Sequence, residues 1–189
     1  MPIHAKHEAA NALWRFTSEH RAGERDLASF SQALADLVCK VLGVPNATIW
    51  TIDHTDAYGS SLRPLASSSH GSVGEQDTPP PIQWPNSSLL LAEIDRHSVV
   101  SCADTAFAVL PLALQAMRLA VSTPKALMVV GGYLNGLLVS LICVTSDGCP
   151  RRWSGVERQL LQRLSAQIVA CVAHRSQAGV LRLVERSLD

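Results

Sequence analysis

The chain has 189 residues, of which 47% are hydrophobic and 17% are charged, and its 16 basic residues balance its 16 acidic residues. This composition predicts a single globular domain, and the zero net charge gives little attraction to nucleic acid or to an anionic membrane. No apolar run approaches the roughly 20 residues of a membrane span, and residues 1–20 lack the apolar block of a signal peptide. We therefore expect a cytoplasmic protein with no nucleic-acid or membrane partner.

The cysteines and histidines favour neither a disulfide framework nor a metal site. Four of the five cysteines lie within apolar stretches, and all five are widely spaced, at Cys39, Cys102, Cys143, Cys149 and Cys171. This pattern is typical of reduced thiols in a protein core. Most histidines fall in expected loops or near the termini, and no group of them has metal-ligand spacing, so we expect no metal.

The first part of the chain predicts two helices. Residues 5–21 carry apolar side chains, including Trp14 and Phe16, at helical intervals up to an interruption at Gly23. A second apolar stripe begins near Glu24 and ends at Leu42, before the helix-terminating pair Gly43 and Pro45. We expect the first helix to be an extension that packs on the protein's own last helix or on a second subunit.

A series of strands and crossover segments follows. Residues 47–53 predict a strand, and residues 61–68 predict a weaker one, which Pro64 assigns to a sheet edge. The stretch 67–85 is rich in serine, glycine, acidic residues and proline, so we expect an extended loop. The remaining expected elements are a short helix after Asn86, a strand at residues 98–102 and a crossover helix at residues 107–120.

The last third predicts a hairpin followed by a long helix. Residues 126–130 and 137–144 are apolar runs joined by Asn135-Gly136, a pair that favours a reversing turn. The second run is apolar at both alternating sets of positions, so we expect its strand to be covered on both faces. Ser154 and Glu157 then provide a helix start, and the helical pattern continues to Leu188.

Residues 126–174 resemble the C-terminal half of a GAF domain, the small-molecule sensor module of signalling proteins. The resemblance rests on the strand, reversing turn and strand, on the sequence Arg-Arg-Trp-Ser-x-x-Glu at 151–157, and on Leu-Leu-x-x-Leu-x-x-Gln-Ile at 160–168. It extends to residues 34–42, 47–53 and 99–104, and covers about residues 25–175. Val130 stands where the family usually has proline, and Ser140 where it usually has glycine.

The resemblance implies a GAF/PAS-like α/β (α+β) fold with a central antiparallel sheet of five or six strands. In that fold the N- and C-terminal helices cover one face, while crossover helices and loops enclose a ligand pocket on the other. We expect three parts: a helical extension at 1–23, the GAF domain at 24–175, and a signalling or dimerisation extension of the last helix at 176–189. By position, the implied ligand-binding residues are Trp50, Cys102, Asp104, Thr105, Met117 and Ser140.

The implied function is that of a non-catalytic sensor that binds a small molecule and relays this event through paired terminal helices. Its homodimer would act on an output domain beyond this chain, such as a kinase, a cyclase or a transcription regulator. The sequence identifies neither the ligand nor a cofactor. Residues 107–120 contain neither the cysteine nor the histidine that bilin-binding relatives use, which argues against photoreception.

Two alternatives remain open. One is a pure dimerisation or protein-interaction module without a ligand. The other is a redox enzyme resembling the free methionine sulfoxide reductases, for which Cys102, Cys143 and Cys149 are the available cysteines. No nucleophile elbow and no glycine-rich phosphate loop is present in the sequence.

Overall fold

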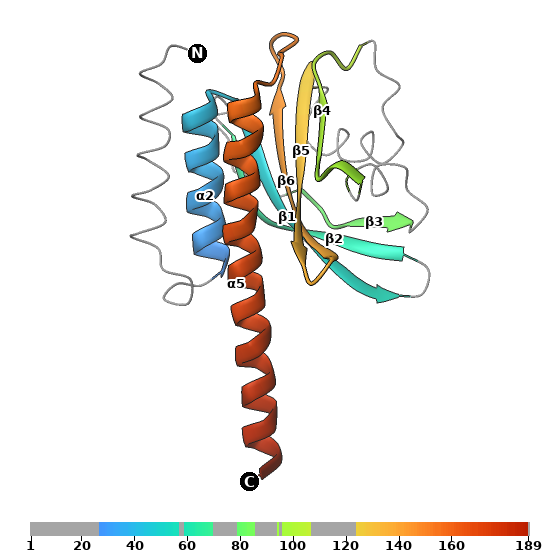
Figure 1. Cartoon of the computed structure of the whole chain (residues 1–189), viewed down its shortest axis with the longest axis vertical. Coiled ribbons are helices and arrows are strands. Elements are labelled where there is room, and N and C mark those ends of the chain that lie inside the picture. The colour runs from blue at the N-terminus through green and yellow to red at the C-terminus, as the bar shows by residue number, and fades with distance from the viewer. Residues whose placement is uncertain are drawn as a thin grey trace.

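The chain forms a curled six-stranded antiparallel sheet with two long helices against one face (Figure 1). This computed structural model describes residues 27–56, 59–69, 79–85, 94, 96–106 and 124–188. The strand order across the sheet is β3-β2-β1-β6-β5-β4. In sequence order the elements are α2 (Leu27–Leu42), β1 (Asn46–Asp56), β2 (Gly59–Ser69), β3 (Ile82–Pro85), β4 (Val99–Cys102), β5 (Ala126–Leu134), β6 (Leu137–Ser146) and α5 (Gly155–Leu188).

This architecture confirms the predicted α+β fold class with an antiparallel sheet. The hairpin of β5 and β6 turns at Asn135 and Gly136, which have φ angles of 52° and 80° as the Asn-Gly pair predicts. The expected extension at 1–23 and the crossover helix at 107–120 lie outside the described residues.

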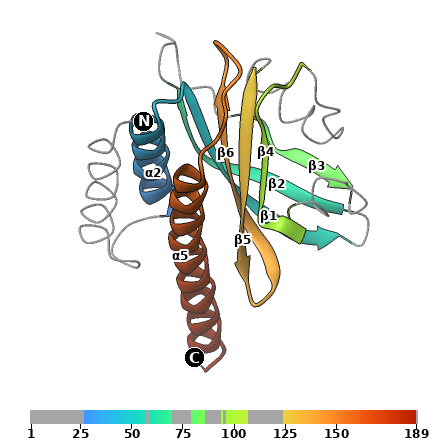
Figure 2. The same ribbon diagram turned by 45° about the horizontal axis from the view of Figure 1, so that its top comes forward.

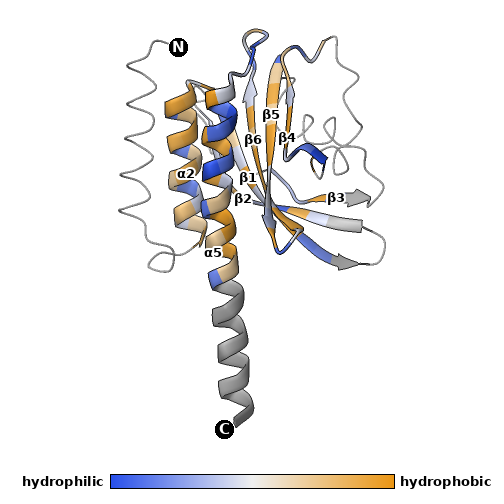
Figure 3. Cartoon of the chain, in the orientation of Figure 1, coloured by the Kyte–Doolittle hydropathy of each residue, from blue (hydrophilic) through white to orange (hydrophobic). Residues whose placement is uncertain are grey.

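The first face of the sheet is the one that α2 and α5 cover, lying side by side in both views (Figures 1 and 2). Apolar side chains of the two helices pack here on alternate residues of the strands, and Figure 3 shows hydrophobic as well as hydrophilic residues along the upper part of α5. This core includes Phe30, Leu34, Val38, Ala47, Ile49, Met128, Val130, Ile142, Val144, Leu161, Leu164 and Ile168.

The second face carries a separate apolar cluster. Its buried members are Trp50, Ile52, Leu62, Ile94, Leu127, Val129, Leu138, Leu141 and Cys143. Ile94 reaches this face from the helical residues just before β4, and the Tyr133 hydroxyl donates to its carbonyl oxygen at 2.7 Å. The centre of the sheet is therefore covered on both sides, as the apolar pattern of β6 predicts.

Strand β2 corrects one expectation. Pro64 favours an edge position because proline cannot donate a ladder hydrogen bond, yet β2 lies between β3 and β1. The pairing with β1 shifts at this point, so that Ile49 faces Ala66 while Trp50 faces Pro64. This irregularity adds a residue to β2, and it accommodates the missing donor inside the sheet.

Two consecutive glycines of β5 lie in close contact with side chains from both faces of the sheet. A Cβ atom on Gly131 would lie 2.7 Å from the Ile94 side chain on the second face. A Cβ atom on Gly132 would lie 2.3 Å from Ser140 Oγ and 2.7 Å from Ser165 Oγ of α5, on the first face. Since real Cβ contacts do not come so close, a larger residue at either position would force the neighbouring side chains to shift.

Helix α5 has 34 residues, and its C-terminal part projects beyond the sheet (Figure 1). At 1.5 Å per residue it spans roughly 50 Å. This length confirms the helix predicted as far as Leu188. Within the described part of the chain, no helix is both long enough and apolar enough to cross a membrane.

We predict that Gly132→Ala lowers the free energy of unfolding by about 1–3 kcal/mol, because the added methyl group overpacks the contact between β5 and α5. Urea denaturation would measure this change. Gly148→Ala is the matched control, since a Cβ atom at Gly148 meets nothing within 4 Å and the free energy should change little. Equal effects of the two substitutions would contradict the close approach of α5 at Gly132.

Candidate functional site

The candidate site is the second face of the sheet, centred on Trp50. Strand β1 places the Trp50 side chain here because alternate residues of a strand point to opposite faces, so Ala47 and Ile49 lie on the first face. The Trp50 side chain is 1% exposed, and its indole Nε1 has no hydrogen-bond partner among the described residues. Buried N–H groups are normally paired, so this donor is a candidate contact for a bound molecule.

The surroundings of Trp50 are apolar. Leu141 pairs with Trp50 from β6, and Cys143 follows on the same face. Burial raises the pKa of the Cys143 thiol to about 12, so the thiol stays protonated and uncharged at neutral pH. The described part of this face therefore combines an apolar wall with a single unpaired donor.

Three other predicted residues lie at the end of β4 and just beyond it. The side chain of Cys102 is half-buried and packs against the second-face cluster. Asp104 accepts a hydrogen bond from the Ala106 amide at 3.0 Å, which forms a local turn. Thr105 is buried, and its hydroxyl donates to the Pro124 carbonyl oxygen while its amide donates to that of Lys125. These hydrogen bonds of Asp104 and Thr105 therefore fix the backbone at the margin of the second face.

Ser140 lies on the other side of the sheet, which corrects the expectation that it shares a pocket with Trp50. Its Oγ approaches the same point above Gly132 as Ser165 Oγ of α5, so it belongs to the first face. The reason is the ordinary alternation of β6, in which Ser140, Ile142 and Val144 share the first face while Leu141, the partner of Trp50, lies on the second. The β5–β6 pairing shifts next to Ser140, where Gly132 faces Ser140 but Tyr133 faces Leu138, so the extra residue Val139 leaves Leu138 on the second face as well. The sixth predicted residue, Met117, lies outside the described residues.

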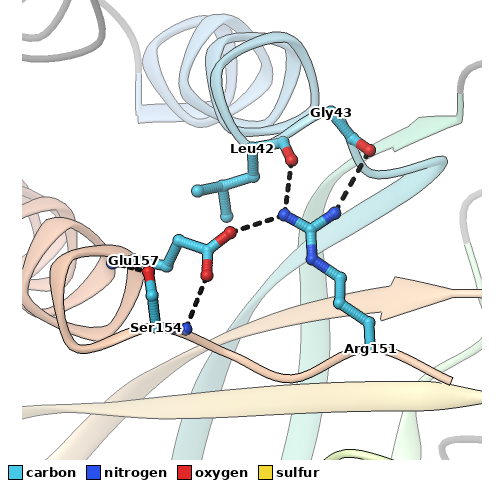
Figure 4. Close-up of polar contacts among 5 residues, drawn as sticks. All are labelled: Leu42, Gly43, Arg151, Ser154 and Glu157. Atoms are coloured by element: carbon cyan, nitrogen blue, oxygen red, sulfur yellow. Dashed lines mark hydrogen bonds and ion pairs between the residues drawn. The ribbon is translucent and has the colours of Figure 1, made fainter. Parts of the chain in front are cut away.

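A group of polar contacts joins the margin of the site to both helices, and its centre is Arg151 (Figure 4). The Arg151 guanidinium donates to the carbonyl oxygens of Leu42 at 2.7 Å and of Gly43 at 3.3 Å, at the C-terminal end of α2. It also pairs with Glu157 of α5 at 2.5 Å. On its other side the guanidinium carbon lies 4.9 Å from the centre of the Trp153 ring.

Ser154 and Glu157 form the capping box that the sequence predicts at the start of α5. The Ser154 amide donates to Glu157 Oε2 at 2.7 Å, and the Glu157 amide donates to Ser154 Oγ at 3.3 Å (Figure 4). Burial alone would raise the pKa of Glu157, but the hydrogen bonds from Ser154 and Arg151 outweigh burial and hold this pKa below its usual value. Glu157 is therefore ionised at neutral pH, as its pairing with Arg151 requires.

Trp153 connects this group to β4. Its indole Nε1 donates to the carbonyl oxygen of Cys102 at 3.2 Å, and the Arg151 amide donates to that of Ala103 at 2.9 Å. Arg151 and Trp153 contributed to the family resemblance, but they were not among the predicted site residues. The hydrogen-bond acceptors of Trp153 and Arg151 lie about 50 and 110 positions away in the sequence, so local sequence patterns do not reveal these contacts. The signal available in the sequence was the charged and aromatic character of residues 151–153.

The comparisons with known proteins agree with this geometry. A family model for the GAF domain matches residues 26–172. The chain belongs to the GAF family. Among curated protein sequences, none matches this chain.

Solved GAF structures have the same fold. The GAF domain of a phosphoenolpyruvate-protein phosphotransferase from Coxiella burnetii superposes with a TM-score of 0.69 at 14% identity, covering 93% of this chain and 98% of that one. The blue-light absorbing form of the PixJ GAF domain from Thermosynechococcus elongatus gives 0.65 at 13% identity, covering 88% and 97%. A bacteriophytochrome from R. palustris gives 0.68 at 13% identity, covering 99% of this chain but 41% of that one. At these identities the likeness shows the fold.

The five cysteines of this GAF domain are free thiols in different environments. Cys143 is buried on the second face, and Cys39 is buried on the first, where burial raises its pKa to about 11. Cys149 is exposed in the turn before α5. In the described part of the chain, no group of three or more histidine, cysteine or acidic residues has the arrangement of a metal site.

We predict that a maleimide reagent modifies Cys149 of the folded protein well before Cys143 or Cys39, because the thiolate is the reactive form and both buried thiols have raised pKa values. Peptide mass spectrometry over a time course at pH 8 would measure this order. The same reagent on urea-unfolded protein provides the control, in which the order should disappear. Rapid modification of Cys143 in the folded protein would instead favour the redox-enzyme alternative.

Proposed function

We propose that this GAF domain is a non-catalytic sensor that binds a small molecule on the second face of its sheet. The observation that carries the proposal is the buried, unpaired indole N–H of Trp50. Leaving such a donor without a partner costs roughly 1–3 kcal/mol, a cost that a ligand with a hydrogen-bond acceptor would remove. The family resemblance assigns the ligand pocket to this same face.

The chemistry around Trp50 favours a mainly apolar, uncharged ligand that carries an acceptor such as a carbonyl oxygen. The aliphatic side chains of Leu127, Val129 and Leu141 offer no hydrogen bonds, and the Cys143 thiol is protonated. An ionised group would lose its hydration here without gaining an opposite charge from these residues. Cys102 and Met117 complete the proposed lining, while Asp104 and Thr105 belong to its rim.

We predict that Trp50→Phe weakens binding of an apolar, carbonyl-bearing ligand identified by a thermal-shift screen, in which nucleotides, small carboxylates and haem serve as ionised comparison compounds. In the wild type a ligand at 100 times its dissociation constant should stabilise the fold by about 2.7 kcal/mol. Loss of one hydrogen bond, worth about 0.5–1.5 kcal/mol, should raise the dissociation constant roughly 2- to 10-fold in isothermal titration calorimetry. Without ligand, loss of the unpaired donor costs nothing in itself, but the smaller ring leaves a cavity in the second-face cluster, so the variant should be less stable by about 1–2 kcal/mol and its affinity is compared below its own unfolding temperature.

Ser140→Ala is the control that separates the two faces. Ser140 Oγ lies beside α5, so its removal should leave the dissociation constant unchanged. A loss of affinity in Ser140→Ala with none in Trp50→Phe would place the ligand on the first face. Absence of any stabilising ligand in a broad screen would favour the alternative of a dimerisation module with a filled interior.

The proposed relay is a homodimer formed through the terminal helices. Beyond residue 174, α5 continues as a helix past the sheet, with Val180, Leu181, Val184 and Leu188 at helical spacing (Figure 1). Isolated helical segments of about this length are marginal in water, so a second copy of α5 is a fitting partner for this stripe. Such a pair would pass the signal to an output domain outside this chain, in the cytoplasm.

We predict that Leu181→Glu shifts the protein from dimer to monomer, because a carboxylate would then have to be buried between the paired helices. Light scattering after size-exclusion chromatography, over a concentration series, would measure the mass. Arg182→Gln makes the same change of one unit in net charge at a position outside the i, i+3, i+4 spacing of the stripe and should leave the dimer intact. A wild-type protein that remains monomeric at the highest concentration would contradict this proposal.

A further inference from the structure

We propose that Arg151 and Trp153 form a coupling joint that transmits displacements of β4, at the margin of the second face, to α2 and α5 on the first face. As the route of a ligand signal, the joint rests on the proposed sensor function. As a mechanical coupling, it rests only on the contacts among three elements that are distant in the sequence. Figure 4 shows the part of the joint that links Arg151 to both helices.

The first arm of the joint reaches β4. Cys102 packs its side chain against the second-face cluster, while its carbonyl oxygen accepts the Trp153 indole N–H. The next carbonyl oxygen, that of Ala103, accepts the Arg151 amide. Two consecutive backbone acceptors at the end of β4 are thus held by the segment that leads into α5. A movement of Cys102 on the second face must therefore move or break these two bonds.

Strand β4 is suited to such movement. It has four residues and lies at the edge of the sheet, where β5 is its neighbouring strand. Its Val99, Val100 and Cys102 are only half-buried, in contrast to the buried centre of β5. Segments with few buried contacts open at lower free energy than the core of a sheet. Of the described strands that contribute to the second-face cluster, β4 is therefore one that a bound molecule can displace without disrupting the central hairpin.

The second arm reaches the C-terminal end of α2. Gly43 adopts a φ of 59°, and the Val44 amide donates to the Cys39 carbonyl oxygen at 3.1 Å, which ends the helix in a Schellman motif. The carbonyl oxygens of Leu42 and Gly43 then accept hydrogen bonds from the guanidinium. A cation at this end of a helix is also favoured by the helix dipole. Arg151 therefore fixes the end of α2 to the segment that β4 holds.

The third arm reaches the start of α5 through Glu157. One carboxylate oxygen of Glu157 accepts from Arg151 and the other accepts from the Ser154 amide, so the capping box and the guanidinium share one side chain. The side chains of Arg151 and Glu157 are 24% and 10% exposed, which limits screening of the pair by solvent. The stacking of Arg151 on Trp153 joins this arm to the first.

Hydrogen exchange measured by NMR tests the joint without any ligand, because each arm contains a hydrogen-bonded reporter. These reporters are the Val44 amide for α2, the Arg158 amide, which donates to Ser154, for α5, and the Arg151 amide and Trp153 indole N–H for β4. Trp153→Phe removes the bond to Cys102 and keeps an aromatic ring beside Arg151, and because Trp153 is buried in the first-face core it also leaves a small cavity, whose general effect the reference amides below report. The expected result is exchange about fivefold faster at Val44 and Arg158 as well as at Arg151, the size of one lost hydrogen bond.

Arg151→Gln provides the reciprocal test from the other end. It removes the bonds to α2 and to Glu157, and it should accelerate exchange of the Trp153 indole N–H on the β4 side. The exposed neighbour Arg152 offers a matched control: Arg152→Gln should leave all the reporters unchanged. Amides of the β1–β6 ladder serve as an internal reference, because a general loss of stability would accelerate them too. If Trp153→Phe does not fold, the result for Arg151→Gln decides.

Acceleration confined to the arm whose bond was removed would overturn the joint and leave three independent local contacts. Acceleration of the β1–β6 reference amides to the same degree as the reporters would overturn it as well, since it would indicate only global destabilisation. Because no ligand is added, either outcome is separate from failure of the proposed sensor function. That function fails instead if no compound binds near Trp50.

Discussion

Burial of the β5–β6 hairpin from both sides is the constraint on which the rest of this structure depends. Ile94 on the second face closely approaches the backbone at Gly131, and helix α5 on the first face closely approaches the backbone at the next residue, Gly132. A strand held in this way cannot shift toward one layer without losing packing against the other. The hairpin therefore fixes the positions of α5 and of the helical residues before β4, and it leaves the edges of the sheet as the parts that can change.

This arrangement explains why the contacts of Arg151 and Trp153 lie where they do. A rigid central sheet separates the two apolar clusters, so a change on one face reaches the other most readily around the sheet margin. The segment from Cys102 to Thr105 is at that margin, and the chain between β6 and α5 passes beside it. The same few residues thus contact the proposed ligand face and both terminal helices, which makes a long path through the core unnecessary.

The elements that the sequence predicted well are those that neighbouring residues determine. The turn at Asn135-Gly136, the end of α2 at Gly43 and the start of α5 at Ser154 each depend on a few adjacent side chains. The opposite faces of Trp50 and Ser140 could not be predicted, because they depend on the register of β1 against β6, in which Trp50 faces Leu141 and Thr51 faces Ser140. The hydrogen bonds from Arg151 to α2 could not be predicted from the sequence either, because their acceptors are backbone oxygens, which every residue carries.

The departure of this chain from the family at Ser140 also has a structural explanation. Ser140 stands where GAF domains usually have glycine, and its direct cross-strand partner is Gly132. Gly132 leaves open the space that the hydroxyl of Ser140 approaches, so a small residue on one strand compensates for the larger one on the other. This replacement of glycine by serine lies beneath α5, on the first face of the sheet. It therefore alters helix packing rather than the proposed ligand face, which carries the unpaired indole of Trp50 and its apolar neighbours.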